Sequence, residues 1–260
     1  MNTMAIVPTY NERDNIERLL EELLACQQDL QVVVVDDNSP DGTGAVVDAW
    51  VAQNQRVHVV HRAGKLGLGT AYIAGFKYAL AHHAERIITM DADFSHNPRF
   101  IPRMLQASTE ADVVIGSRYI SGGGTLNCSY RRRLLSRGAN LFAKTLLSLQ
   151  ARDCTAGFRC YRSDVLHAIK FESIYANGYS YLIEMLAAVQ SKGYLVAEIP
   201  ILFEDRRFGT SKISSDEIWR AIGTVLRLFT RNIHRLTVQF PGMLHEDAEA
   251  APAPTSTHLE

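Results

Sequence analysis

The chain has 260 residues, which fits one large α/β domain or two small ones. Apolar residues make up 47% of the sequence and charged residues 21%, the composition of an ordinary globular protein rather than of a fibrous or disordered one. The formal net charge of −1 argues against general nucleic-acid binding, so any basic surface must be local.

The sequence predicts neither secretion nor a membrane span. A strand pattern and a motif follow Met1 within about ten residues, which leaves no room for the regions of a signal peptide. No run of about 18 apolar residues occurs. The cysteines lack the spacing of a metal site or a disulfide framework; they are Cys26, Cys128, Cys154 and Cys160. We therefore expect free thiols and a cytoplasmic location.

Strand and helix patterns alternate along the first half of the chain. Short apolar segments predict strands, and apolar residues at helical spacing predict the helices between them. The predicted strands are Met4–Val7, Gln31–Val35, Val57–Val60, Arg86–Met90 and Asp112–Gly116, and the predicted helices are Arg13–Ala25, Thr43–Gln53, Thr70–His83 and Pro98–Ala107. Strands that are apolar throughout indicate a mostly parallel α/β sheet with helices on both faces, which binds ligands beyond the carboxyl ends of its strands.

The second half is less regular. Its predicted elements are a glycine-rich turn Ser121–Thr125, helix Leu134–Leu149, strand Gly157–Arg162, helix Tyr179–Ser191, an extended segment Tyr194–Phe203 that Pro200 interrupts, a basic loop Arg206–Ser215 and helix Asp216–Leu236. The last helix is amphipathic and carries several arginines, so it either packs on the sheet or lies in a membrane interface. Trp219 and Phe229 favour a lipid or a membrane-bound partner. The Ala/Pro/Thr-rich tail that follows is predicted to be disordered.

The stretch Met90–His96 carries the most informative motif. A predicted strand ends there in Asp91 and Asp93, whose side chains point the same way on an extended segment. Hard oxygen ligands at the mouth of a strand suit Mg²⁺ or Mn²⁺, which proteins hold with one or two carboxylates plus substrate phosphates. Taken alone, such a pair also occurs where acids simply end a strand.

Two other polar clusters follow the first and second predicted strands. Tyr10 offers a stacking face for a base and Glu12 offers a carboxylate for ring or ribose donors, although a turn followed by helix-start acids is the simpler explanation of these two residues. Asp37 follows the second strand, where acids accept hydrogen bonds from a base or ribose in nucleotide-binding folds. The loop Gly64–Gly69 lacks the spacing of a P-loop and of a dinucleotide fingerprint, and we expect it to pack near the base.

Basic side chains collect in the second half. Arg118 follows a strand end, and a cluster from Tyr130 to Arg137 opens a helix. Arg206 and Lys212 lie in the basic loop. A basic run is usually a solvated surface, but here a nearly neutral chain carries its arginines on segments expected to converge on an acidic metal site. Since arginine forks pair with phosphate, we predict that a polyanion binds between them.

These blocks, taken in order, resemble the dolichol-phosphate mannose synthases of the family 2 glycosyltransferases. The likeness runs from about residue 5 to residue 235. Many sugar transferases share the first blocks and the Asp-x-Asp, and far fewer share the acceptor-side blocks. The matching blocks are Pro8–Glu12, Val35–Thr43, Lys65–Tyr72, Met90–His96, Gly116–Tyr119, Ser136–Asn140, Asp153–Arg159, Gly178–Glu184 and Arg206–Lys212.

The resemblance implies a GT-A, Rossmann-like fold that uses GDP-mannose and Mg²⁺ or Mn²⁺ to mannosylate a dolichyl or polyprenyl phosphate. It implies a guanosine site made by Pro8, Tyr10, Glu12, Val35 and Asp37. Further residues would hold donor and metal: Asp91 and Asp93, with Ala92 lining the diphosphate. Ser95 stands where some relatives carry a glutamine as third metal ligand, and a hydroxyl is a poorer ligand.

The resemblance also implies the residues that handle the reacting phosphates. Arg118, Arg206 and Lys212 would bind phosphates of donor or acceptor, and Arg132 and Ser136 would contact the lipid phosphate. Such a phosphate is largely dianionic at neutral pH and is already a nucleophile, so no general base is expected. The cations would remove the repulsion between two anions, and one-step attack from the opposite face would invert the anomeric centre.

The implied organisation is a catalytic domain over residues 1–214, with a donor half 1–117 and an acceptor-side half 118–214. An amphipathic helix follows at 215–238 and a disordered tail at 239–260. We expect a peripheral protein on the cytoplasmic face of a membrane. It would reach the membrane through the surface helix or through a small membrane-anchoring subunit.

Three alternatives remain. The same chemistry with another nucleotide sugar, such as UDP-glucose, would use all of these residues. A phosphatase with Asp91 as nucleophile is disfavoured because the motif follows the fourth strand and lacks a later acidic pair. A non-catalytic nucleotide-binding subunit is disfavoured because both carboxylates are kept.

Overall fold

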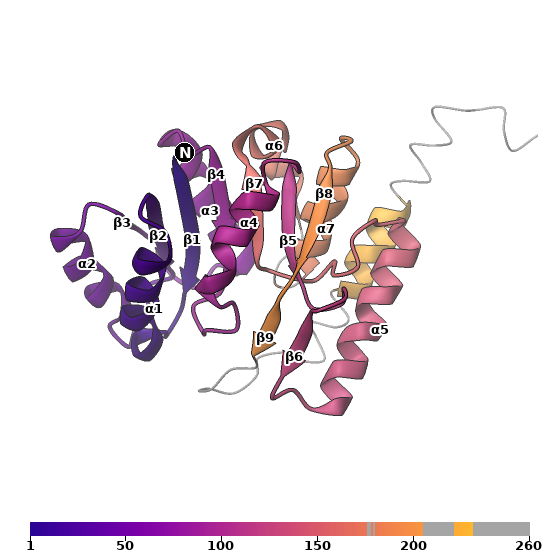
Figure 1. Ribbon diagram of the computed structural model, residues 1–260, viewed down its shortest axis with the longest axis horizontal. Helices are drawn as coiled ribbons and strands as arrows, with labels where there is room; N and C mark the ends of the chain where they lie inside the picture. Colours follow the sequence, from indigo (N-terminus) through magenta and orange to yellow (C-terminus); the bar gives the residue numbers. More distant parts are fainter. Residues whose placement is uncertain (176–177, 179, 205–220, 231–260) are drawn as a thin grey trace, which may run out of the picture.

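A seven-stranded mixed sheet runs through the protein (Figure 1). The computed structural model describes residues 1–175, 178, 180–204 and 221–230, except for the side chains of residues 131 and 132. The strands of the sheet are β1 (Thr3–Thr9), β2 (Leu30–Asp36), β3 (Val57–His61), β4 (Arg86–Thr89), β5 (Val113–Ser117), β7 (Arg159–Arg162) and β8 (Val196–Pro200).

The strand order is β3-β2-β1-β4-β7-β5-β8. Every pair is parallel except the two made by β7, which runs antiparallel to both β4 and β5. The mostly parallel sheet predicted from the sequence is therefore confirmed, with one reversed strand inside it. Because β1, β2, β4 and β5 all run the same way, the polar segments that follow them meet at one edge.

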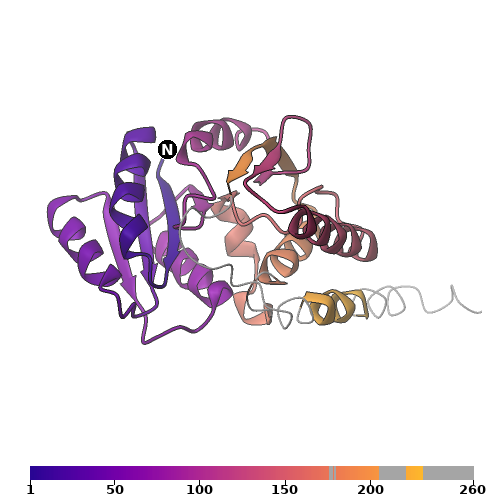
Figure 2. The same cartoon turned by 90° about the horizontal axis from the view of Figure 1, so that it is seen from below.

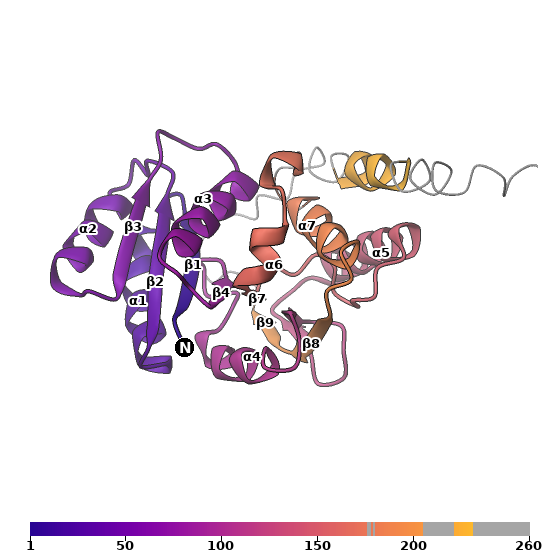
Figure 3. The same cartoon turned by 90° about the horizontal axis from the view of Figure 1, so that it is seen from above.

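Helices cover both faces of this sheet, as predicted. One face carries α3 (Leu68–Ala81), α6 (Ser163–Ala168) and α7 (Ser180–Gln190), and the other carries α1 (Arg13–Cys26) and α4 (Ile101–Ala107) (Figures 2 and 3). The remaining helical elements are α2 (Thr43–Gln53), η1 (Pro98–Phe100), α5 (Tyr130–Leu147) and η2 (Phe171–Ser173). Alternate residues of β1 divide between the faces: Met4 and Ile6 join one buried cluster, and Ala5 and Val7 the other.

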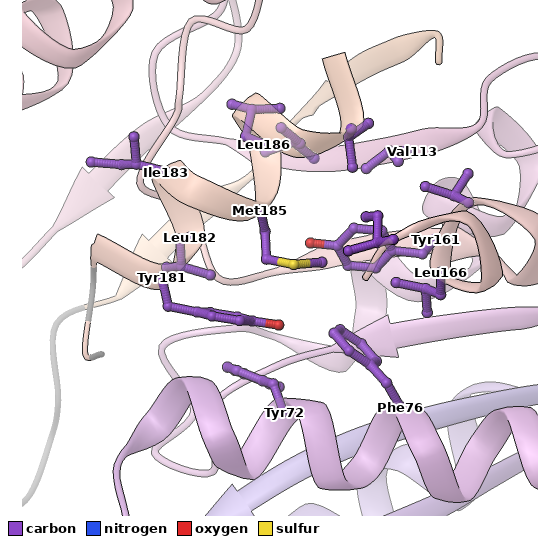
Figure 4. Close-up of a cluster of buried hydrophobic side chains, with 14 of the residues drawn as sticks. Tyr72, Phe76, Val113, Tyr161, Leu166, Tyr181, Leu182, Ile183, Met185 and Leu186 are labelled. Carbon is purple, nitrogen blue, oxygen red and sulfur yellow. The ribbon is translucent and has the colours of Figure 1, made fainter. Parts of the chain in front are cut away.

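Aromatic side chains join α3 to the second half of the chain. The rings of Tyr72 and Tyr181 stack with centroids 6.1 Å apart, and Phe76 meets Tyr161 edge to face at 5.5 Å (Figure 4). Glycine lets α3 approach its neighbours closely, since a Cβ at Gly69 would lie 2.8 Å from the Tyr181 ring. This packing fixes the N-terminal end of α3 beside the carboxyl end of β4.

The second half differs from the sequence prediction at three places. A small parallel sheet of β6 (Gly124–Leu126) and β9 (Leu202–Glu204) replaces the second part of the predicted turn Ser121–Thr125. Helix α6 was not predicted, and α5 begins at Tyr130 rather than at Leu134. The predicted interruption of the extended segment Tyr194–Phe203 by Pro200 is confirmed, because β8 ends at Pro200 and β9 begins at Leu202.

The helical segment 221–230 packs on α7 and α5. Val225 and Leu228 are buried in the core. Arg227 Nη2 donates to both carboxylate oxygens of the buried Glu184, at 3.1 Å each. The sequence left two alternatives for this helix, packing on the core or lying in a membrane interface. A membrane helix needs exposed apolar side chains, so over residues 221–230 the structure favours core packing.

Several predicted features lie outside the described residues. They are the basic loop with Arg206 and Lys212, the flanks of helix Asp216–Leu236, the tail 239–260, and the side chain of Arg132. Among the residues that are described, no helix combines the length and the apolar character that crossing a membrane requires.

Candidate active site

A cavity of about 960 Å³ lies at the carboxyl ends of β4 and β5. Its polar lining includes Asp91, Asp93 and Ser95 after β4 and Arg118 after β5. Its apolar lining comes from three helical segments: Leu134, Leu135 and Phe142 of α5, Leu182 and Ile183 of α7, and Ile222 and Val225 of segment 221–230. One end of the cavity is thus ionic and the other is suited to a hydrocarbon.

Asp91 is oriented by two side chains that stand on different elements. Tyr72 of α3 donates a hydrogen bond from its hydroxyl to Asp91 Oδ1 at 3.1 Å. Burial, followed by the nearby Asp91 charge, raises the pKa of Tyr72 well above its ordinary value, so this hydroxyl stays protonated as a donor. The Asp91 backbone N–H donates to Nδ1 of His96 at 2.9 Å.

His96 has a structural role in this arrangement. Its Nδ1 accepts from a backbone N–H, which means that this nitrogen carries no hydrogen. The ring is buried and stacks on Phe158 with centroids 5.2 Å apart. A Cβ at Gly157 would lie 3.3 Å from the His96 ring, so a glycine there leaves room for it. The nitrogen nearest the carboxylates is therefore engaged by the backbone.

Asp93 and Ser95 form the deeper part of the ionic end. Asp93 is 8% exposed, and its Oδ1 accepts from the Ser95 backbone N–H at 3.1 Å. Phe94 between them adopts a left-handed conformation, φ 60°, which turns the chain back over the carboxylate. The Ser95 hydroxyl is buried and finds no hydrogen-bond partner among the described residues. A buried oxygen that lacks a partner beside two carboxylates fits a cation or its water.

Arg118 faces the cavity while it is held from behind by Asp153. The guanidinium donates from Nε and Nη2 to the two Asp153 oxygens, at 2.7 Å each, and from Nη2 to the Thr155 hydroxyl, also at 2.7 Å. Burial alone would raise the pKa of Asp153, but the Arg118 charge and hydrogen bonds hold it below its ordinary value. The pair is bidentate, so the position of Arg118 is fixed before any ligand arrives.

The first turns of α5 bring further polar groups to the cavity. The hydroxyls of Ser136 and Tyr119 are hydrogen-bonded at 2.8 Å. Arg133 lines the cavity, and its Nε is buried with no partner in the described part of the chain. A buried N–H without an acceptor, in an arginine that lines the cavity, fits an anionic ligand.

A second polar region lies beyond the ends of β1 and β2. Asp37 is buried and forms an ion pair with Arg62, Nη1 to Oδ1 at 3.1 Å. Burial raises the pKa of Asp37, while Arg62 and the Leu66 backbone N–H oppose that rise. The Lys65 ammonium lies 4.5 Å from the centroid of the Tyr10 ring. The loop Gly64–Gly69 therefore meets this region through Lys65 and Leu66.

The other residues of the implied guanosine site lie on the same strand ends. Pro8 and Val35 are register partners across β1 and β2. The Val35 side chain is buried in the core, so only its backbone faces a ligand. Glu12 accepts a hydrogen bond from the Asn15 amide at 2.9 Å, and its own backbone N–H donates to the Thr43 hydroxyl.

The structure thus brings most of the predicted site residues to one edge of the sheet. Asp91, Asp93, Ser95, Arg118 and Ser136 line one cavity. Ala92 lies between the two carboxylates in the sequence. Its side chain is buried in the core cluster on the face of the sheet that α1 and α4 cover. The guanosine-site residues do not line the cavity but follow the neighbouring strands β1 and β2.

Sequence reasoning missed four side chains that shape the site. Tyr72, Asp153 and Arg62 each hold a predicted site residue, namely Asp91, Arg118 and Asp37. Arg133 stands beside the predicted Arg132. Two of the four, Tyr72 and Asp153, lie within the matching blocks Lys65–Tyr72 and Asp153–Arg159. Their partners, Asp91 and Arg118, could not be found from the sequence because the fold brings them together from distant segments.

Known proteins resemble this chain over most of its length. The sequence profile described as Glycosyl transferase family 2 matches residues 4–170. An undecaprenyl-phosphate mannosyltransferase of Micrococcus luteus is 40% identical over 227 residues, which are 87% of this chain and 93% of the relative. A polyprenol monophosphomannose synthase of Mycolicibacterium smegmatis is 43% identical over 223 residues, 85% of this chain and 84% of the relative.

A solved structure also shares the fold. Glucosyl-3-phosphoglycerate synthase from Mycobacterium tuberculosis, crystallised with Mn²⁺, UDP and glucosyl-3-phosphoglycerate, superposes with a TM-score of 0.60 at 16% identity. The match covers 88% of this chain and 80% of that one. At this level of identity the likeness shows the architecture alone, and it confirms the GT-A-like fold that the sequence blocks implied.

Proposed function

This chain belongs to glycosyl transferase family 2, and on that basis we propose that it transfers mannose from GDP-mannose to a dolichyl or polyprenyl monophosphate. The products would be polyprenyl β-mannosyl phosphate and GDP. The two bacterial relatives described above are named for mannosyl transfer to lipids of this kind, which supports the substrate class.

The observation that carries the proposal is the two-sided character of the cavity. A paired carboxylate and an arginine stand at one end, and aliphatic side chains of α5, α7 and segment 221–230 form the rest of the wall. A sugar diphosphate requires the first environment and an isoprenoid requires the second. A transferase with a small polar acceptor has no use for the apolar end.

Asp91 and Asp93 are the residues that would hold a divalent cation, with Ser95 as a weaker third ligand. Among the described residues no three His, Cys, Asp or Glu side chains form a complete metal site, so substrate phosphates and water would supply the other ligands. When bound, such a cation neutralises the negative charge that develops on the departing diphosphate.

In the reaction a lipid phosphate oxygen bonds to C1 of mannose while the bond from C1 to GDP breaks, and GDP leaves with the electron pair. The attack is from the face opposite GDP, which inverts C1. The acceptor is largely dianionic at neutral pH and has no proton to lose. This agrees with the engaged nitrogen of His96, because no base is required beside the carboxylates.

The remaining difficulty is electrostatic. Two unit charges at 4 Å repel by about 4 kcal/mol at an effective dielectric of about 20. Arg118 and Arg133 line the cavity and would offset this repulsion, with Ser136 placed to donate to the acceptor phosphate. We assign the same role to Arg132, Arg206 and Lys212. Asp153 already neutralises part of the Arg118 charge, so the other cations would have to offset more of the repulsion between the two phosphates.

Guanine recognition is assigned to the region after β1 and β2. The Asp37 carboxylate would accept the two N–H groups on the edge of guanine, and Tyr10 would stack on the ring. The Arg62 charge opposes the rise that burial causes in the pKa of Asp37. A uracil ring offers one N–H to such a carboxylate, so this site favours GDP-mannose over UDP-glucose.

A competition assay tests donor and acceptor together. The pure protein is given equal amounts of differently labelled GDP-mannose and UDP-glucose with a short-chain polyprenyl phosphate and Mn²⁺. We expect mannose in the lipid product, with the β configuration in the NMR coupling constants. Glucose in that product, or an α linkage, would refute the donor or the inverting mechanism, and bound GDP-mannose without any lipid product would indicate a non-catalytic subunit.

A further inference from the structure

The solvent-facing side of α5 is apolar. Tyr130, Leu134 and Leu141 are 77%, 60% and 64% exposed and fall on one stripe because they are separated by four and seven residues. Leu135 and Phe142, 52% and 40% exposed, form a parallel stripe beside it. The buried positions of the helix lie on the opposite side. A helix on a globular protein normally turns its polar side to water, so these solvent-exposed apolar side chains of α5 are unusual.

Positive charge accompanies this apolar face. The sequence of α5 contains no acidic residue and five basic ones: Arg131, Arg132, Arg133, Arg137 and Lys144. The chain as a whole has a net charge of −1, so this concentration is local. A helix that exposes large apolar side chains and carries only basic charges suits the interface of a bilayer that contains anionic lipids.

The same surface continues into the cavity. Leu134, Leu135 and Phe142 belong both to the exposed face and to the cavity lining. Figures 1 and 2 show α5 at the edge of the molecule beside segment 221–230, with the small sheet of β6 and β9 near its N-terminal end. A lipid that enters the cavity past these side chains has its chain beside α5, which requires α5 to lie at the membrane.

Segment 221–230 offers a weaker alternative surface. Its Val225 and Leu228 are buried in the core, and Arg227 is held by Glu184. Within this segment Leu226 is the large apolar side chain that is exposed. Over residues 221–230, the helix that the sequence had suggested for the membrane therefore exposes less apolar surface than α5 does.

We propose that the outward face of α5, formed by Tyr130, Leu134, Leu135, Leu141 and Phe142, is the surface by which this protein docks on an anionic bilayer. The proposal rests on the proposed function, since a lipid substrate gives the protein its reason to approach a membrane. It adds which element makes the contact and which lipid charge it prefers.

Vesicle co-sedimentation of the full chain, without nucleotide sugar, tests the proposal. The vesicles are phosphatidylcholine alone or phosphatidylcholine mixed with phosphatidylglycerol. The test variant is Tyr130→Gln with Leu141→Gln, because neither residue lines the cavity. The matched control is Leu195→Gln, a leucine that is 56% exposed just before β8. We expect wild type and control to sediment with anionic vesicles, and the double variant to bind at least about tenfold more weakly.

A measurement on the wild type removes dependence on the variants. Hydrogen exchange over residues 130–147 should slow when anionic vesicles are added and not when neutral ones are. Equal vesicle binding by wild type and double variant, or unchanged exchange in α5, would overturn the proposal. The proposal would also be overturned if, without vesicles, the wild type were a dimer and the double variant a monomer. That result would assign the face to a second copy of the chain.

Failure of this proposal is distinct from failure of the proposed function. Transfer to a short-chain, water-soluble polyprenyl phosphate needs no bilayer and reports the chemistry alone. The double variant should keep that activity and lose transfer to a long-chain acceptor presented in vesicles. Loss of both activities in a folded double variant would contradict the assignment of Tyr130 and Leu141 to docking only.

Discussion

Ser95 carries a hydroxyl that is buried beside two carboxylates and has no hydrogen-bond partner among the described residues. In the metal-free protein this unpaired group is a cost, so Ser95→Ala should leave the free energy of unfolding unchanged or raise it by up to about 1 kcal/mol. If the hydroxyl ligates a cation, the variant should gain less thermal stability from Mn²⁺ than wild type does. Equal Mn²⁺-induced shifts in Tm would remove Ser95 from the ligand set.

Arg133 and Arg137 provide a matched pair on α5. Arg133 lines the cavity with a buried, unpaired Nε, whereas Arg137 is exposed and lies over the Tyr119 ring. Losing a charged hydrogen bond to the acceptor phosphate should lower kcat/KM for the lipid about tenfold to a hundredfold in Arg133→Gln. The KM for GDP-mannose should change little. Similar effects of Arg137→Gln would show that the loss reflects general charge rather than a specific contact.

Asp153 makes a prediction about stability and pH. Its pKa is lowered in the folded protein, so its contribution is present above the unfolded value near 3.9 and is lost as pH falls through the folded pKa. Asp153→Asn leaves Arg118 with half of its bidentate partner and should cost about 3 kcal/mol at pH 7. Denaturant titrations should show this difference shrinking below about pH 4. A difference that is constant from pH 7 to pH 3 would contradict the ionic role.

The site residues divide by the kind of information that each requires. Asp91, Asp93 and Arg118 follow strand ends and could be predicted from strand periodicity together with the general position of ligands in such sheets. Tyr72 and Asp153 could not, because each acts on a residue that reaches it only through tertiary packing. That the Arg133 side chain lines the cavity depends on the rotation of α5, which no local pattern specifies.

At the scale of elements, the contact between α3 and β1 depends on a glycine. A Cβ at Gly75 would lie 2.2 Å from Cγ2 of the buried Ile6, whereas a Cβ at Gly138 in α5 meets nothing within 4 Å. Gly75→Ala should therefore destabilise the fold by about 1–3 kcal/mol despite its better helix propensity. Gly138→Ala should stabilise it by about 0.5–1 kcal/mol. Urea unfolding of both variants measures this, and equal effects would contradict the close packing.

The elements of the first half were predictable because strand and helix periods alternate there without interruption. β1, α1, β2, α2 and β3 all appear within a few residues of their predicted limits. The second half was less predictable, since β6 and β9 are three residues long and pair with each other across a long stretch of sequence. β7 lies between β4 and β5 and runs antiparallel to both, and the pattern of a four-residue strand does not indicate its direction.

At the scale of the whole molecule, the sheet joins two halves with different tasks. The strand ends of β1, β2 and β4 carry the acidic and nucleotide-facing residues, and α5, α7 and segment 221–230 supply the apolar wall. The cavity lies where these halves meet, so under the proposed function donor and lipid phosphate would approach each other from different chemical environments. Under the proposed function the acceptor phosphate needs no general base, and the cations with a divalent metal would offset the repulsion between the two anions.

Metal-dependent transfer by wild type and Asp93→Ala is the most direct test of this account. Pure protein is incubated with labelled GDP-mannose and a short polyprenyl phosphate, with Mn²⁺ or with a chelator, and the lipid product is counted. We expect product in the wild type only when Mn²⁺ is present, and a loss of more than about a thousandfold in Asp93→Ala. Wild-type rates in the chelator, or a variant as active as the wild type, would contradict the central role of the paired carboxylates.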